Sequence, residues 1–219
     1  PVSRSASHAI NCATTAKTQR HWGGVLSRPI SIIIKRRLLV AHIVKDVLSL
    51  DDIHLSGKRV LYRVDINSPI HPETGAFLDD GRLRAIIPTL TGLSEARVVI
   101  LGHQSRPGKD DFTDLSGHAE RLGRILGRPI RFVPDVCGKE AIDAIRSLKN
   151  GEIICLDNVR MHNEEISLKK AELDELRLSQ IVMNLAPEFD AYVTDAFAAT
   201  HRNSPTLTGF ADDLPCIAG

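Results

Sequence analysis

The sequence predicts an α/β domain in which helices cover both faces of a mainly parallel sheet. Short apolar runs alternate along the chain with stretches of helical periodicity, and this alternation is typical of βαβ units. Runs such as 98–101 (VVIL) and 153–156 (IICL) are apolar throughout, which indicates strands buried on both faces. With 42% hydrophobic and 25% charged residues, the composition is that of an ordinary globular protein.

The expected elements follow one another from residue 58 onward. The apolar run 58–64 predicts the first strand, and apolar residues at helical spacing predict a helix over 83–93 in which Pro88 causes a kink. Phe197 is expected to be a buried anchor of the core. Further strands are expected at 97–101, 130–133, 152–156 and 191–194, and further helices at 116–126, 139–148 and 168–185. Together these elements make a three-layer, Rossmann-like domain.

The first 45 residues differ in charge from the rest of the chain. They contain eight Lys or Arg and no Asp or Glu, which leaves 20 basic and 27 acidic side chains elsewhere, a net charge of −7. We therefore divide the chain into a basic arm, 1–45, and a domain, 46–219. The arm has the composition of an organelle transit peptide or of translated upstream sequence, and we expect it to be disordered or not native.

The same composition bears on partners and location. An acidic body disfavours binding of nucleic acid, and no apolar run approaches the roughly 18 residues that a membrane helix needs. We therefore expect a cytoplasmic protein that binds neither nucleic acid nor membrane.

Polar clusters follow the predicted strands. Ligands of open α/β sheets bind outside the carboxyl ends of the strands, so side chains at these ends are candidates for one site. We call this set the strand-end rim. Its members are Arg63, Asp65 and Asn67 after the first strand, Arg82 at the start of the first helix, His103, Gln104, Ser105 and Arg106 after the second, Arg160 after the fourth, and His201 and Arg202 after the fifth.

The strand-end rim favours a small ligand with several negative charges. One arginine alone is more often a solvated surface charge or half of a salt bridge, but several at neighbouring strand ends need a common counter-charge. Guanidinium groups bind phosphate and carboxylate oxygens in pairs. Asp65 and Asn67 would accept hydrogen bonds from ligand hydroxyl groups, whereas Arg63 is the member that we most expect to pair inside the protein.

Motifs for other chemistries are absent from the sequence. The chain has no P-loop, no Gly-x-Gly-x-x-Gly after a strand and no Gly-x-Ser-x-Gly elbow, and its four cysteines lack the spacing of a zinc site. Carboxylate pairs such as Asp110–Asp111 are expected to be solvated turns or caps. We therefore expect no metal site and no cofactor site in this chain.

Four segments of the rim resemble the signature segments of the phosphoglycerate kinases. They are 63–67 (RVDIN), 103–107 (HQSRP), 157–160 (DNVR) and 195–202 (DAFAATHR), and they occur in the family's order and at its spacing. The resemblance covers about Leu50 to Gly219, which corresponds to the family's N-terminal domain. Gln104-Ser105, where most bacterial and eukaryotic members have Leu-Gly, is similar to the archaeal branch.

The resemblance implies a function and a role for each residue. The reaction would be reversible phosphoryl transfer between 1,3-bisphosphoglycerate and ADP, giving 3-phosphoglycerate and ATP. Asp65 and Asn67 would hold the hydroxyl and carboxyl end of 3-phosphoglycerate, and Arg82 would be catalytic at the transferring group. The 3-phosphate would be held by His103, Arg106, Arg160 and Arg202, with Gln104 and Ser105 in the binding loop and His201 orienting the rim.

The resemblance also implies what this chain lacks. The Mg-ATP or Mg-ADP of the family is bound by a C-terminal domain, which would lie beyond Gly219. We therefore expect a chain that carries the 3-phosphoglycerate half-site, is inactive alone, and is monomeric in the full-length enzyme.

Two other readings stay open at this point. The chain would be a stand-alone, non-catalytic binding module for a phosphorylated acid if a stop codon followed Gly219. It would be an interaction protein if the basic arm bound an acidic surface, and trimming residues 1–45 without loss of binding would remove that reading.

Overall fold

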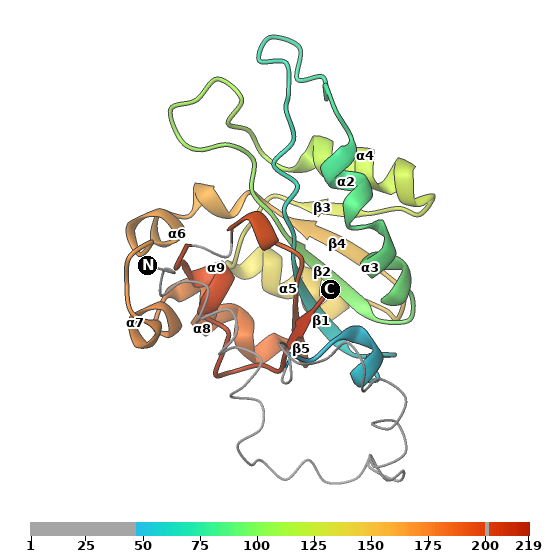
Figure 1. The fold of residues 1–219 in the computed structure, drawn as a ribbon, viewed down its shortest axis with the longest axis vertical. Coiled ribbons are helices and arrows are strands. Elements are labelled where there is room, and N and C mark those ends of the chain that lie inside the picture. The colour runs from blue at the N-terminus through green and yellow to red at the C-terminus, as the bar shows by residue number, and fades with distance from the viewer. Residues whose placement is uncertain (1–46, 200–201) are drawn as a thin grey trace, which may run out of the picture.

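Six parallel strands form the central sheet of the structure, a computed structural model that describes residues 47–199 and 202–219. The spatial order is β3-β4-β2-β1-β5-β6, and every neighbouring pair runs parallel. The middle strand β1 lies between β2 and β5 (Figure 1). The strands are β1 (Arg59–Arg63), β2 (Arg97–Leu101), β3 (Arg131–Val133), β4 (Ile153–Leu156), β5 (Ala191–Thr194) and β6 (Cys216–Ala218).

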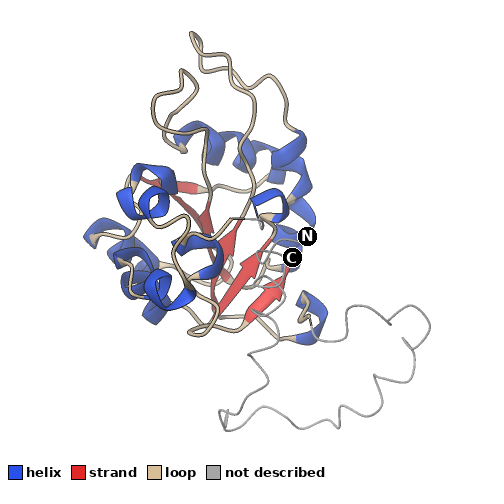
Figure 2. Ribbon diagram, turned by 60° about the vertical axis from the view of Figure 1, so that its left-hand side comes forward, coloured by secondary structure: helices blue, strands red, loops and turns tan. Residues whose placement is uncertain are grey.

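Helices cover both faces of the sheet, as Figures 1 and 2 show. Residues of α2, α3 and α4 pack on one face, and residues of α5 and α8 pack on the other, which confirms the three-layer α/β fold. The helices are α2 (Gly81–Ala85), α3 (Ile87–Gly92), α4 (Ser116–Leu126), α5 (Lys139–Ser147), α6 (Asn163–Ser167), α7 (Leu173–Arg177), α8 (Gln180–Leu185) and α9 (Pro205–Thr208). Short 3-10 turns are η4 (Leu50–Asp52), η5 (Val159–Met161), η6 (Ala186–Glu188) and η7 (Phe197–Ala199).

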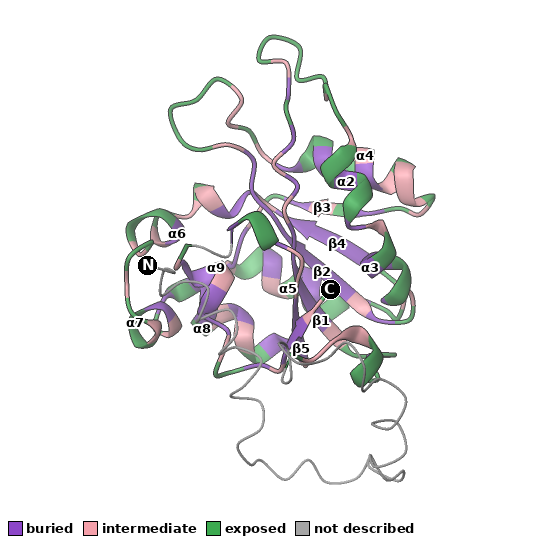
Figure 3. Cartoon of the chain, in the orientation of Figure 1, coloured by how far each residue is buried: buried purple, intermediate pink, exposed green. Residues whose placement is uncertain are grey.

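Successive residues of each strand serve opposite layers of the core. In β1, Leu61 belongs to the cluster on the α5 side, whereas Val60 and Tyr62 belong to the cluster on the α4 side. All three side chains are fully buried, and strands β1, β2, β4 and β5 are buried almost throughout (Figure 3). Side chains alternate between faces in a strand, so two covered faces require the continuous apolar runs that the sequence contains.

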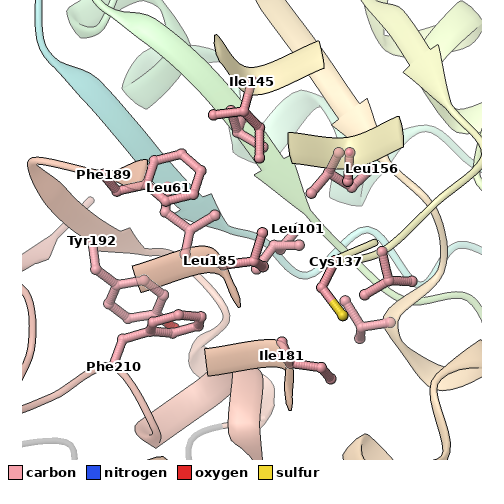
Figure 4. Packing of buried hydrophobic residues seen from close by; sticks show 14 of the residues in the cluster. Leu61, Leu101, Cys137, Ile145, Leu156, Ile181, Leu185, Phe189, Tyr192 and Phe210 are labelled. Carbon is pink, nitrogen blue, oxygen red and sulfur yellow. The ribbon is translucent and has the colours of Figure 1, made fainter. Parts of the chain in front are cut away.

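Aromatic side chains fasten the segment after β5 to the sheet. Tyr192 of β5 stacks on Phe210 with ring centroids 5.4 Å apart, in the layer that also holds Leu61 and Leu185 (Figure 4). The Tyr192 hydroxyl donates to the carbonyl oxygen of Thr206 at 2.8 Å. These contacts place Thr206 beside the carboxyl end of β1, where the candidate site begins.

The prediction of a single helix at 168–185 is wrong, because the structure has two short helices, α7 and α8, within this range. The Ser179 hydroxyl accepts the backbone N–H of Val182 at 3.4 Å and thereby begins α8. A serine that caps a new helix interrupts the previous one while the apolar stripe continues. The helix predicted over 83–93 is also divided, into α2 and α3, with Pro88 in the first turn of α3 as the expected kink implies.

Two further differences concern the end of the domain. Phe197, which we expected in the core, is 86% exposed. β6 was not predicted, because three residues give no pattern of their own and become a strand by pairing with β5. The arm, 1–45, lies outside the described residues. Within the described ranges, no helix is both long enough and apolar enough to cross a bilayer.

Candidate functional site

The carboxyl ends of the strands meet at one edge of the sheet, and their loops are hydrogen-bonded to one another. The loops after β1 and β2 extend side by side from this edge (Figures 1 and 2). The backbone N–H of Ser105, after β2, donates to Oδ1 of Asn67, after β1, at 2.7 Å. Arg160, after β4, donates from Nη1 to the carbonyl oxygen of Ser105. The structure thus joins rim residues that follow three different strands.

Arg63 ends β1 and points into the protein. Its side chain is buried, with 2% of the residue exposed, and its Nε donates to Oγ1 of Thr206 at 3.1 Å. Nη1 donates to the carbonyl oxygen of Val64, and Nη2 lies 3.3 Å from Nδ1 of His103. Arg63 therefore pairs inside the protein, as we most expected of it, and supports the rim from beneath.

His103 is a buried and neutral histidine. Burial, above all, and then the positive charges of Arg63, Arg160, Arg202 and Arg82, in that order, together lower its pKa to about 2. Because Arg63 can only donate, we assign Nδ1 of His103 as the acceptor and place the ring proton on Nε2. In this state the imidazole is able to donate one hydrogen bond to an anionic ligand.

Arg82 and Asp65 form an ion pair at the edge of the rim. Nη1 of Arg82 donates to Oδ2 of Asp65, and the other carboxylate oxygen accepts the backbone N–H of Asn67. The Arg82 side chain is 45% exposed, whereas that of Asp65 is 13% exposed. The guanidinium group is therefore both oriented by Asp65 and open to a ligand.

Several guanidinium groups crowd around Arg160. This side chain is half-buried, and burial lowers its pKa most; Arg202 and Arg63 lower it further, Glu165 opposes them, and Arg106 adds a smaller lowering. Like charges in this proximity raise the free energy of the unliganded site. A multiply charged anion would relieve that repulsion, so the arrangement favours such a ligand.

Gln104 occupies the interior beneath the rim. Its side chain is fully buried; Nε2 donates to the carbonyl oxygen of Ser68 at 3.0 Å, and Oε1 lies 3.1 Å from Nε2 of His118. Asn158 donates to the carbonyl oxygens of Gln104 and Thr113, at 2.8 Å each. The side chain of Gln104 and its backbone carbonyl oxygen are therefore both engaged in holding the loop.

The structure adds residues that the sequence did not indicate. His118 lies on a helix face without any motif, and Glu165 was one acidic residue among many. Asp111 lies in a turn and is half-exposed, as expected of it, but the sequence did not indicate that its Oδ1 accepts a hydrogen bond from the Ser105 hydroxyl. His201 lies outside the described residues. Two surface hollows, of about 540 and 430 Å³, lie elsewhere on the described part of the chain, and no rim residue lines them.

Metal ligands do not gather in the described part of the chain. Ranges 47–199 and 202–219 contain no group of three or more His, Cys, Asp or Glu side chains arranged to hold a metal ion. Most of the rim side chains are cations or hydrogen-bond donors, which suit an anionic ligand.

The buried histidines predict a loss of stability in mild acid. Burial lowers the pKa of His103 to about 2 and that of His118 to about 4. The unfolded chain, whose histidines titrate near 6.5, therefore binds more protons below that pH than the folded chain does. The contribution of these histidines to the free energy of unfolding is expected to be at its maximum above pH 6.5. It should fall by about 1–2 kcal/mol per histidine between pH 7 and 5.

Urea unfolding at pH 7 and pH 5 checks this expectation. The variant His118→Gln keeps a donor for Gln104 but cannot titrate, so the difference between its two free energies of unfolding should be smaller than that of the wild type. Equal differences in the two proteins would contradict the assignment.

Comparison with known proteins places the chain in a family. Residues 50–219 match the family model for phosphoglycerate kinase. The phosphoglycerate kinase of Methanothermobacter thermautotrophicus is 48% identical over 173 residues, which are 78% of this chain and 42% of that protein. The phosphoglycerate kinase of Thermoplasma volcanium is 42% identical over 174 residues, which are 80% of this chain and 42% of that protein.

Solved structures agree with the sequence relatives. The crystal structure of phosphoglycerate kinase from Pyrococcus horikoshii OT3 has a TM-score of 0.76 and 36% identity, covering 79% of this chain and 42% of that chain. The structure of phosphoglycerate kinase from Coxiella burnetii has a TM-score of 0.60 and 26% identity, covering 78% and 41%. This chain spans about 42% of the length of the curated relatives it matches. By these matches in sequence and in fold, the chain belongs to the phosphoglycerate kinase family, on its archaeal-like branch.

Proposed function

We propose that this chain carries the 3-phosphoglycerate half-site of a phosphoglycerate kinase. In the reaction, the phosphoryl group on the carboxyl end of 1,3-bisphosphoglycerate passes to the terminal phosphate oxygen of ADP, giving 3-phosphoglycerate and ATP. The observation that carries the proposal is the crowding of guanidinium groups around His103 and Arg160 at one edge of the sheet. A substrate with a phosphate at one end and a carboxylate at the other would supply the negative charge that balances these arginines.

The geometry suggests a division of labour within this half-site. Arg160, Arg106, Arg202 and the neutral His103 would hold the 3-phosphate, with His201 orienting the rim. Arg82, half-exposed and fixed by Asp65, would clamp the carboxyl end and stabilise the transferring group as the catalytic residue. Asp65 and Asn67 would accept hydrogen bonds from the substrate hydroxyl. Phosphoryl transfer asks chiefly for such positioning and charge neutralisation.

The nucleotide half of the reaction belongs to residues outside this chain in our proposal. Mg-ATP or Mg-ADP would be bound by a C-terminal domain, whose closure over the rim would exclude water from the transfer. The chain alone would then bind 3-phosphoglycerate without turnover. The full-length protein would be a cytoplasmic monomer that binds neither membrane nor nucleic acid.

Calorimetric titration of the 219-residue chain tests the proposal. We expect saturable binding of 3-phosphoglycerate, and binding at least about tenfold weaker for glycerol 3-phosphate, which keeps the phosphate and lacks the carboxylate. A parallel assay with 1,3-bisphosphoglycerate and ADP should show no turnover. A folded chain, by circular dichroism, that binds neither ligand would overturn the half-site, and turnover above background would overturn the placing of the nucleotide site.

A further inference from the structure

Ser105 has a backbone conformation that its side chain disfavours. Its φ is 52°, and it is the only residue other than glycine with a positive φ in the ranges that the structure describes. In this left-handed region the β-carbon of an L-residue crowds the backbone, so the conformation persists only where neighbouring groups hold it. Ser105 lies within the loop after β2, in the middle of the rim.

The polar groups of Ser105 are all engaged, and two of them lead to rim side chains. The backbone N–H donates to Oδ1 of Asn67 at 2.7 Å, and the carbonyl oxygen accepts from Nη1 of Arg160. The hydroxyl donates to Oδ1 of Asp111. The position of Ser105 therefore determines where two side chains of the rim can lie.

Asp111 also contacts the residue before Ser105. Nε2 of Gln104 lies 3.4 Å from the carbonyl oxygen of Asp111 and 3.5 Å from its Oδ2. No ion pair of Asp111 occurs within the described ranges. Beside a proposed anion site, a carboxylate repels the ligand, so its presence needs a reason other than charge.

We propose that Asp111 is a positioning residue of the half-site. Its carboxylate holds the Ser105 hydroxyl and thereby keeps the loop in the left-handed conformation that fixes Asn67 and Arg160. The identity of the ligand in this inference rests on the proposed function, whereas the positioning of the loop by Asp111 does not. In this proposal Asp111 affects substrate binding through the position of Ser105.

The two effects of Asp111 on ligand binding have opposite signs. Removal of its negative charge alone would strengthen the binding of an anion, whereas loss of the positioned loop would weaken it. We expect Asp111→Ala to weaken the binding of 3-phosphoglycerate about tenfold, the factor that corresponds to releasing one strained residue. The neighbouring, exposed Asp110 provides the control: Asp110→Ala removes the same charge, and its affinity should be unchanged or higher.

A glycine background separates positioning from a general effect on folding. Glycine adopts a positive φ without the crowding, so Asp111→Ala should weaken binding less than threefold when added to Ser105→Gly. A tenfold loss in both backgrounds, or a tighter complex of Asp111→Ala, would overturn the proposal.

A readout without ligand keeps this test independent of the proposed function. The Ser105 amide, which donates to Asn67, should exchange its hydrogen at least about tenfold faster in Asp111→Ala than in the wild type, at an unchanged urea midpoint. Unchanged exchange would overturn the positioning role even if 3-phosphoglycerate binds. Faster exchange in a chain that does not bind 3-phosphoglycerate would support the positioning role and refute the proposed function.

Discussion

Replacing Arg82 and Arg106 together by alanine is expected to weaken the binding of 3-phosphoglycerate at least about hundredfold, as measured by calorimetric titration. The double variant removes two charge-assisted contacts to the proposed ligand. It also leaves Asp65 beside the site without its ion-pair partner, and this carboxylate then repels the anion. The two consequences act in the same direction.

A matched double variant separates these contacts from overall charge. Arg124→Ala with Arg131→Ala removes the same two positive charges from exposed positions on α4 and β3. Arg124 pairs with the exposed Glu120, and Arg131 lies 3.5 Å from the carbonyl oxygen of Ala144. We expect this protein to bind within about threefold of the wild type. Similar losses in both double variants would mean that net charge, and not the rim, attracts the ligand.

Replacing Glu165 by alanine is expected to lower the free energy of unfolding by about 3 kcal/mol. Glu165 is buried and accepts hydrogen bonds from the hydroxyl of Ser204 and the hydroxyl of Thr206, both at 2.7 Å, and from the backbone N–H of Thr206 at 3.0 Å. The Thr206 hydroxyl in turn accepts from Nε of the buried Arg63. Without the carboxylate, the buried donors of Ser204 and Thr206 lose their acceptor, and Arg160 loses a negative charge that opposes the surrounding arginines.

Urea unfolding at pH 7 measures this loss, and the preceding residue in the same helix provides the control. Glu164 accepts the backbone N–H of Gln180 at an exposed position, so Glu164→Ala is expected to lower the free energy of unfolding by about 1 kcal/mol or less. A loss below about 1 kcal/mol for Glu165→Ala would show that the buried network reorganises around the gap.

Local patterns in the sequence were enough to predict the strand ends. Apart from Arg82, which begins a helix, each rim arginine ends or follows an apolar run that is visible in the sequence, and a parallel sheet brings such ends to one edge. The direction in which a side chain points at that edge could not be predicted in this way. Arg63 points inward because Thr206, 143 residues later in the chain, accepts its Nε–H, and no local pattern contains that contact.

The polar network beneath the rim was not predictable for the same reason. Gln104 and Asp111 look like loop residues in the sequence, and only the packing of the loop against Ser68 and α4 gives their side chains partners. The wrong prediction for Phe197 has a related origin. Apolarity predicts burial only when a covering element exists, and the described residues leave this side chain 86% exposed.

The place of β1 in the sheet has a consequence for synthesis of the protein. β1 ends at Arg63, but one of its two neighbours, β5, begins only at Ala191. At about 5–20 residues per second, a ribosome needs on the order of ten seconds to make the chain between them. Throughout that time one edge of an apolar strand has no partner, and such edges pair readily with other chains. During that time the edge of β1 that β5 covers in the finished domain is open to pairing with other strands.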